Sequence, residues 1–128
     1  IFFIGIRSAE VDELNFMKNN RVNVISAAEF ERLGTSQVVE TVKEKMAHFK
    51  SIYLTLDIDC LDPAYAAGTG TPKFGGLNSR QVLDSLRGLF DLPIIGFDVV
   101  EVAPKLDSSM TSVYAAQRII TECWGHQI

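Results

Sequence analysis

The chain has 128 residues, of which 47% are hydrophobic and 22% charged, and this composition excludes a disordered or low-complexity protein. Its formal net charge of -4, with no basic block anywhere, argues against partners such as nucleic acid or an anionic membrane surface. No apolar run reaches the roughly 18 to 20 residues that span a bilayer, and the first residues lack the basic flank and cleavage site of a signal peptide.

The first third of the chain alternates between short apolar runs and amphipathic segments. A continuous β-branched run predicts a buried strand over 1–6, followed by a helix over about 9–19 that Ser8 caps. A second strand is predicted over 22–25. Ser26 then opens a helical turn that Gly34 closes.

The rest of the chain continues the alternation. Residues at helical spacing, ending with Phe49, predict a third helix that starts at Thr35 or Ser36. Strands are predicted over 51–57 and 94–100, with a helix between them that Asn78 or Ser79 caps. A last helix starts at Ser108 or Ser109. Strand and helix alternate throughout, which predicts one α/β segment over 1–128, with a parallel sheet and helices on both faces.

Carboxylates stand at the ends of two predicted strands. Asp57 ends the 51–57 strand with Asp59 two residues on, and Glu101 follows the 94–100 strand. Parallel sheets form their sites at this edge, and strand alternation places Asp57 and Asp59 on one face with Ile58 in the core. Paired carboxylates select Mg²⁺, Mn²⁺ or a comparable cation. The other interpretation is that the D-x-D pair only caps the strand and bonds the following loop.

Longer motifs carry a family resemblance. The stretch from Thr55 to Pro72, with Gly75 and Gly76 beyond it, resembles the metal-binding signature of the ureohydrolases, the arginase and agmatinase family. The run 96–104 looks like the family's E-V-x-P element, and residues 4–8 look like a strand end of agmatinases. The family usually has proline where Ala67 stands.

This resemblance implies the fold, the chemistry and the site residues. The fold is the arginase-like three-layer α/β/α arrangement with a parallel sheet, and this chain is its C-terminal portion. Asp57 and Asp59 are implied ligands of a binuclear Mn²⁺ site, Glu101 holds the substrate guanidinium, and Thr71 lines the same pocket. The implied reaction is hydrolysis of a small guanidino compound, closer to agmatine than to arginine, to an amine and urea. The implied assembly is a homo-oligomer.

The family's remaining metal ligands belong to G-G-D-H and D-A-H-x-D elements, and neither occurs in these 128 residues. We interpret His48 and His126 as surface residues, the latter in a frayed C-terminus. Cys60 has no basic neighbour in sequence that would activate its thiol, and Asp62 before Pro63 is a turn former.

Two alternatives remain. A phosphatase of the haloacid dehalogenase type uses Asp57 as nucleophile and Asp59 as acid, but it requires threonine where Leu61 stands. A catalytically silent α/β binding module is the other alternative, because upstream metal ligands are absent.

The cysteines and the first residue bear on compartment and chain length. Cys60 and Cys123 are far apart and form no C-x-x-C pair, which indicates a reducing, cytoplasmic environment. Because Ile1 already lies inside an apolar run, we interpret the chain as an internal segment of a longer polypeptide.

Overall fold

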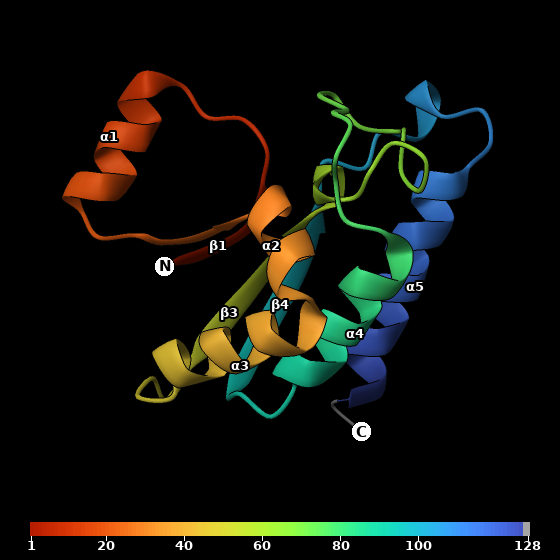
Figure 1. The fold of residues 1–128 in the computed structure, drawn as a ribbon. Coiled ribbons are helices and arrows are strands. Elements are labelled where there is room, and N and C mark those ends of the chain that lie inside the picture. Colours follow the sequence, from red (N-terminus) through yellow and green to blue (C-terminus); the bar gives the residue numbers. More distant parts are fainter. Residues whose placement is uncertain (127–128) are drawn as a thin grey trace.

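The structure is a computed structural model that describes residues 1–126, and in them the predicted alternation of strands and helices is confirmed (Figure 1). In chain order the elements are β1 (Phe2–Ile6), α1 (Val11–Asn19), β2 (Asn23–Ser26), α2 (Ala27–Leu33), α3 (Thr35–Met46), β3 (Ile52–Asp57), the 3₁₀ helix η1 (Ile58–Cys60), α4 (Ser79–Leu89), β4 (Ile94–Val100), the 3₁₀ helix η2 (Pro104–Leu106) and α5 (Thr111–His126). None of the helices within 1–126 combines the length and apolar character that crossing a membrane requires.

The strands pair in parallel, but as two sheets. β1 pairs with β2, and β3 pairs with β4, so the described strands form two two-stranded sheets where the sequence predicts one. β1 contacts η1, at the end of β3, but forms no strand pairing with β3 in residues 1–126. In the second sheet, Ile52 lies opposite Ile94 and Asp57 lies opposite Val100. β3 and β4 therefore end at the same edge.

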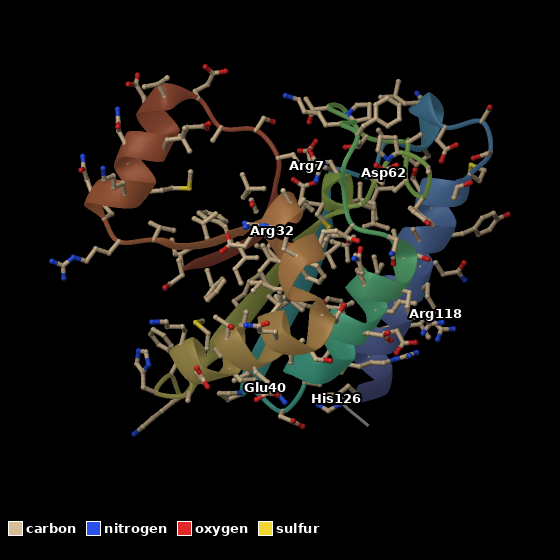
Figure 2. All side chains as sticks on the ribbon, in the orientation of Figure 1. Arg7, Arg32, Glu40, Asp62, Arg118 and His126 are labelled. Atoms are coloured by element: carbon tan, nitrogen blue, oxygen red, sulfur yellow. The ribbon has the colours of Figure 1, made fainter. Side chains whose placement is uncertain are left out.

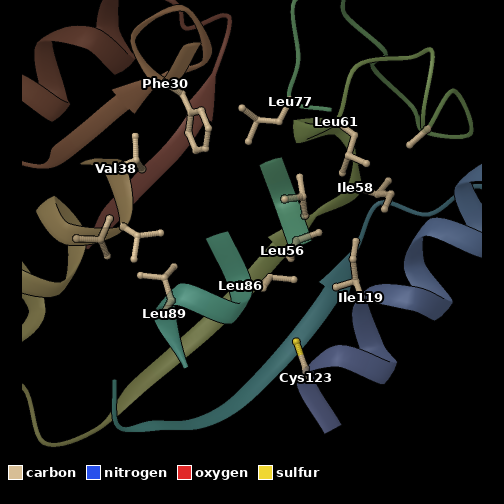
Figure 3. Close-up of a cluster of buried hydrophobic side chains, with 14 of the residues drawn as sticks. Phe30, Val38, Leu56, Ile58, Leu61, Leu77, Leu86, Leu89, Ile119 and Cys123 are labelled. Atoms are coloured by element: carbon tan, nitrogen blue, oxygen red, sulfur yellow. The ribbon is translucent and has the colours of Figure 1, made fainter. Parts of the chain in front are cut away.

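The main core lies between the second sheet and helices α3, α4 and α5. Figure 3 shows Val38 of α3, Leu56 of β3, Leu86 of α4 and Ile119 of α5 in one buried cluster. Removing these side chains from water is the dominant stabilising contribution. Because β3 is a strand, its even-numbered residues face this cluster, while its odd-numbered residues face away.

The other face of β3 and β4 is open in the described residues. Tyr53 is 59% exposed and Ile95 is 69% exposed. On the same face the side chain of Asp98 accepts hydrogen bonds from Thr55 Oγ1 (2.6 Å) and Tyr53 Oη (3.2 Å). The prediction of helices on both faces thus holds for only one face of this sheet in residues 1–126.

Two of the predicted helix caps are confirmed. Ser26 Oγ accepts a hydrogen bond from the Glu29 N–H at the start of α2 (3.2 Å). Asn78 and Gln81 form a reciprocal capping box at the start of α4, with distances of 2.8 and 2.9 Å. Gly34 closes α2 with a positive φ of 79°, which glycine adopts without a Cβ penalty.

Other predicted helix ends are wrong. α1 begins at Val11, and the Glu10 N–H donates to Glu13 Oε2 (2.7 Å), so Ser8 lies outside the helix. α3 ends at Met46, which leaves Phe49 outside it and exposed. α5 begins at Thr111, not at Ser108 or Ser109, because Met110 has a positive φ of 60° that interrupts helical geometry.

Candidate functional site

Three carboxylate residues lie at the edge where β3 and β4 end. Asp57 is the last residue of β3, and Glu101 directly follows β4. Asp59 lies in η1, where its N–H donates to Asp57 Oδ1 (3.0 Å). The strand ends at Asp57, so the alternation argument for Asp59 is wrong, although Ile58 is fully buried as predicted. Asp57 does bond the following turn, and it shares this edge with two further acids.

The charge balance at this edge favours a cation. Burial raises the pKa of Asp57, and the negative charges of Asp59 and Glu101 raise it further, against the opposing effects of the Asp59 N–H and Arg7. A raised carboxyl pKa means that the ionised form is disfavoured, and a bound cation would relieve that cost.

The donor chemistry fits Mn²⁺ only in part. Carboxylate oxygens are hard ligands that suit Mn²⁺ or Mg²⁺. Among residues 1–126, however, no three His, Cys, Asp or Glu side chains gather closely enough to hold a metal ion. Asp57 and Asp59 therefore fit as part of a donor set rather than as a whole one.

The loop between η1 and α4 brings Thr71 back to this edge. Thr71 Oγ1 donates to Asp59 Oδ2 (3.0 Å) across twelve residues of sequence. At the neighbouring Gly70, a Cβ atom would lie 3.8 Å from Glu101 Oε2. The loop thus lies between the D-x-D pair and Glu101.

Glu101 has an unusual backbone conformation. Its φ is 64°, in the left-handed region that residues with a Cβ seldom adopt. Glu101 is exposed and directs the chain out of β4 toward η2. Strained backbone of this kind concentrates at functional sites, because the surrounding structure holds it in place for a purpose other than stability.

Asp62 closes the base of the same loop. Its carboxylate accepts from the N–H groups of Ala64 (3.0 Å), Gly75 (2.8 Å) and Gly76 (3.3 Å), which hold the pKa of Asp62 below its usual range. The Asp62 N–H also donates to the Leu77 carbonyl (2.9 Å). The predicted turn former is confirmed, and it additionally joins the two ends of a long loop.

Arg7 is a site residue to which sequence reasoning assigned no role. Its side chain is 11% exposed, and its guanidinium donates to the carbonyls of Gly5 (3.1 Å), Cys60 (3.2 Å) and Asp59. Figure 2 shows Arg7 near Asp62, at the end of the molecule where β3 finishes. The available signal was a cation directly after a buried apolar strand.

The cysteine and the two histidines considered in the sequence have no role in the candidate site. Burial raises the pKa of the Cys60 thiol to about 12, outweighing the opposing effect of nearby Arg7, so the thiol stays protonated. His48 is exposed beside Phe49. His126 is not frayed, because it ends α5 and its Nε2 lies 2.8 Å from the Phe90 carbonyl oxygen. Figure 2 places His126 at the opposite end of the molecule from Arg7.

Comparisons with known proteins identify the family of this chain. The model of the arginase family matches residues 1–125. Agmatinase from Escherichia coli is 44% identical over 119 residues, which make up 93% of this chain and 37% of that protein. Two solved structures are also similar. Proclavaminate amidino hydrolase from Streptomyces clavuligerus has a TM-score of 0.87 at 40% identity, covering 96% of this chain and 40% of its own. Arginase from Bacillus subtilis has a TM-score of 0.90 at 32% identity, and the match covers 95% of this chain and 42% of the arginase chain.

The chain therefore spans less than half the length of these relatives. Over that length it has the α/β fold with parallel strands of the arginase structures.

Proposed function

Because this chain belongs to the arginase family, we propose that its residues form the C-terminal portion of a Mn²⁺-dependent ureohydrolase that converts an agmatine-like guanidino compound to an amine and urea. The similarity to an agmatinase, at 44% identity, exceeds that to the Bacillus subtilis arginase, at 32%, and this supports the agmatine-like substrate. The amidino hydrolase is 40% identical to this chain, so other guanidino compounds are a second group of candidate substrates.

The observation that carries the proposal is the meeting of three acids at one sheet edge, with Glu101 held in a strained conformation. Asp57 and Asp59 supply part of the metal donor set. When bound, the metal pair supplies positive charge and an activated water molecule. Thr71 fixes the orientation of the Asp59 carboxylate through its 3.0 Å hydrogen bond.

Glu101 is assigned to the substrate. A guanidinium group is planar, carries only N–H donors, and matches a carboxylate that accepts two of them side by side. Because Glu101 is exposed at the end of β4, its carboxylate is accessible to such a cation. Hydrolysis forms one C–O bond, breaks one guanidino C–N bond and transfers a proton to the departing amine nitrogen. Glu101 orients the carbon for that step without taking the proton.

The two carboxylates do not make a complete binuclear site. We expect the 128-residue chain alone to bind Mn²⁺ weakly, because no three metal-ligating side chains gather in its described residues and it spans only 37% of the agmatinase. Isothermal titration of the chain with MnCl₂ tests this point, and tight stoichiometric binding would contradict it.

We also propose a cytoplasmic homo-oligomer. Both cysteines, Cys60 and Cys123, are free, as a reducing compartment favours. Light scattering of the full-length protein measures its assembly state, and a monomer would contradict the second part.

The decisive experiment uses the full-length protein that carries these residues. Urea release is measured from agmatine and from arginine, with Mn²⁺ and after chelation, beside a p-nitrophenyl phosphate assay. We expect Mn²⁺-dependent urea release with agmatine preferred. Phosphate release without urea would replace the proposal by the phosphatase alternative, which the family match disfavours. No turnover of either kind would favour the silent binding module.

A further inference from the structure

A buried carboxylate lies just behind the candidate site. Asp107, between η2 and α5, is 6% exposed. Its Oδ1 accepts from the backbone N–H of Ser109 (3.1 Å) and from the Ser109 hydroxyl. Its Oδ2 accepts from the backbone N–H and the hydroxyl of Ser112, both at 2.8 Å. Both oxygens are therefore fully used inside the protein.

Ser112 also holds the loop that follows η1, through a hydrogen bond to Gly68. Ser112 is fully buried, and its Oγ accepts a 2.6 Å hydrogen bond from the Gly68 N–H. The Gly68 carbonyl accepts in turn from the Ala103 N–H (2.8 Å). We call Asp107, Ser112, Gly68 and Ala103 the clamp. It joins three segments, namely the loop after η1, the chain after β4 and the start of α5.

The clamp leaves no free space at its centre. A Cβ atom at Gly68 would lie 2.7 Å from Asp107 Cβ, 2.9 Å from Ser112 Oγ and 3.1 Å from the Ala103 oxygen. Contacts this short force a shift of the backbone. Glycine at this position is thus required by the close approach of the loop to α5.

Two residues of the clamp, Gly68 and Ala103, lie close in sequence to residues of the candidate site. Gly68 is three residues before Thr71, which bonds Asp59, and Ala103 is two residues after Glu101. The hydrogen bond between Gly68 and Ala103 therefore ties the Thr71 side of the site to the Glu101 side. Ser112 is thus linked through Gly68 to both sides of the site.

We propose that Asp107 and Ser112 are positioning residues that fix Glu101 relative to the Thr71 and Asp59 pair, and that they thereby set the affinity for the guanidinium group. The inference rests on the proposed function, because it assumes that Glu101 receives the substrate. Neither residue is assigned contact with the substrate or the metal.

The test compares Ser112→Ala and Asp107→Asn with a matched control. Ser85→Ala serves as the control, because the Ser85 hydroxyl is also buried on a helix but has no hydrogen-bond partner among the described residues. In the full-length enzyme we expect Ser112→Ala to raise the KM for agmatine about five- to tenfold, the worth of about one hydrogen bond, with kcat changed less than threefold. Manganese content should stay unchanged, and Ser85→Ala should leave KM at the wild-type value.

A second measurement is independent of turnover. Hydrogen exchange of the peptide that covers 68–71 is measured on metal-free protein, and we expect faster exchange in Ser112→Ala than in Ser85→Ala. If Ser112→Ala does not fold, Ser109→Ala removes one outer bond to Asp107 and should change both quantities in the same direction by a smaller amount.

The outcomes separate this inference from the proposed function. A variant that lowers only Tm, with KM and exchange at 68–71 unchanged, would overturn the positioning role. A wild-type protein that releases no urea would overturn the proposed function, whereas the exchange comparison would still test whether the clamp holds the loop. Equal effects of Ser112→Ala and Ser85→Ala would also rule the clamp out.

Discussion

The guanidinium of Arg7 donates to the backbone carbonyl of Asp59 across 52 residues of sequence and lies 3.8 Å from the Asp59 carboxylate. The same group also bonds the carbonyls of Gly5 and Cys60. Because β1 and β3 share no strand pairing in residues 1–126, this side chain is a polar link between the first sheet and the candidate site. It fixes the η1 backbone through the Asp59 and Cys60 carbonyls, while Thr71 fixes the Asp59 side chain.

Arg7→Met should destabilise the protein. The substitution keeps an apolar side chain of similar length but leaves partly buried carbonyls without a donor, which costs about 1–3 kcal/mol for each group left unpaired. Urea denaturation measures the loss of unfolding free energy. Arg7→Lys should recover only part of it, because one ammonium group cannot reproduce the planar fork that reaches three carbonyls. Equal stability of Arg7→Met and wild type would show that the link is dispensable.

Asp57→Ala should remove tight Mn²⁺ binding in the full-length protein. Losing an outer partner of a metal ligand already costs 10- to 100-fold, so losing a direct ligand should weaken binding by at least about 100-fold. Elemental analysis after gel filtration gives the stoichiometry. Asp91→Ala is the control. Asp91 lies in the turn before β4, at the opposite edge of the sheet from Asp57, and forms an ion pair with Lys43 of α3. Full manganese content in Asp57→Ala would end the ligand assignment.

Glu101→Gln should impair substrate use while leaving manganese content unchanged. The amide replaces a carboxylate oxygen by an NH₂ group facing a cation that only donates, so an attraction becomes a clash of donors. Losing one partner of such a charged contact costs on the order of 2–5 kcal/mol in kcat/KM. Steady-state kinetics with agmatine measure the loss of kcat/KM. If the variant kept the wild-type kcat/KM, Glu101 would have no role in substrate binding.

Glu101→Gly separates catalysis from folding at the same position. Glycine adopts a positive φ of 64° without a Cβ penalty, so this variant relieves backbone strain. We expect it to unfold at a Tm no lower than that of wild type while losing at least as much kcat/KM as Glu101→Gln. A large fall in Tm would mean that the side chain is needed for structure.

Acid should weaken the clamp only at low pH. Hydrogen bonds from the Ser109 hydroxyl, and then from the Ser112 N–H and hydroxyl, lower the pKa of Asp107 to about 2. A lowered carboxyl pKa stabilises the fold above the ordinary value near 4, and that stability is lost as pH falls toward about 2. Asp107→Asn should therefore be less stable at pH 7 but lose less on going from pH 4 to pH 2. Thermal unfolding at several pH values tests this, and parallel curves for both proteins would contradict it.

The sequence was informative where local chemistry decides structure. Apolar runs located the four strands of residues 1–126, and Ser26 and Asn78 identified two helix starts, because a cap depends on residues within one turn. The acids at the strand ends could be expected to meet, since parallel strands end at the same edge. Arg7 and Ser112 could not be assigned in this way, because Arg7 bonds Asp59 across 52 residues of sequence and Ser112 bonds the Gly68 N–H across 44.

The division into two sheets was likewise not predictable. Periodicity indicates where strands lie and which face is apolar, but it does not specify which strands are neighbours. The exposed side chains of Tyr53 and Ile95 show that the alternation of strands and helices overestimated how much of this sheet is covered by helices in residues 1–126.

The open face and the free strand edges of these sheets affect how a measured Tm of this chain is interpreted. Each two-stranded sheet leaves unpaired N–H and C=O groups along its outer edges in the described residues, and such edges are templates for further strand pairing. When folded molecules associate through them, mass action makes the unfolding midpoint depend on protein concentration. A Tm recorded for these 128 residues alone is then a property of the solution as much as of the polypeptide, and dilution series are the appropriate way to report it.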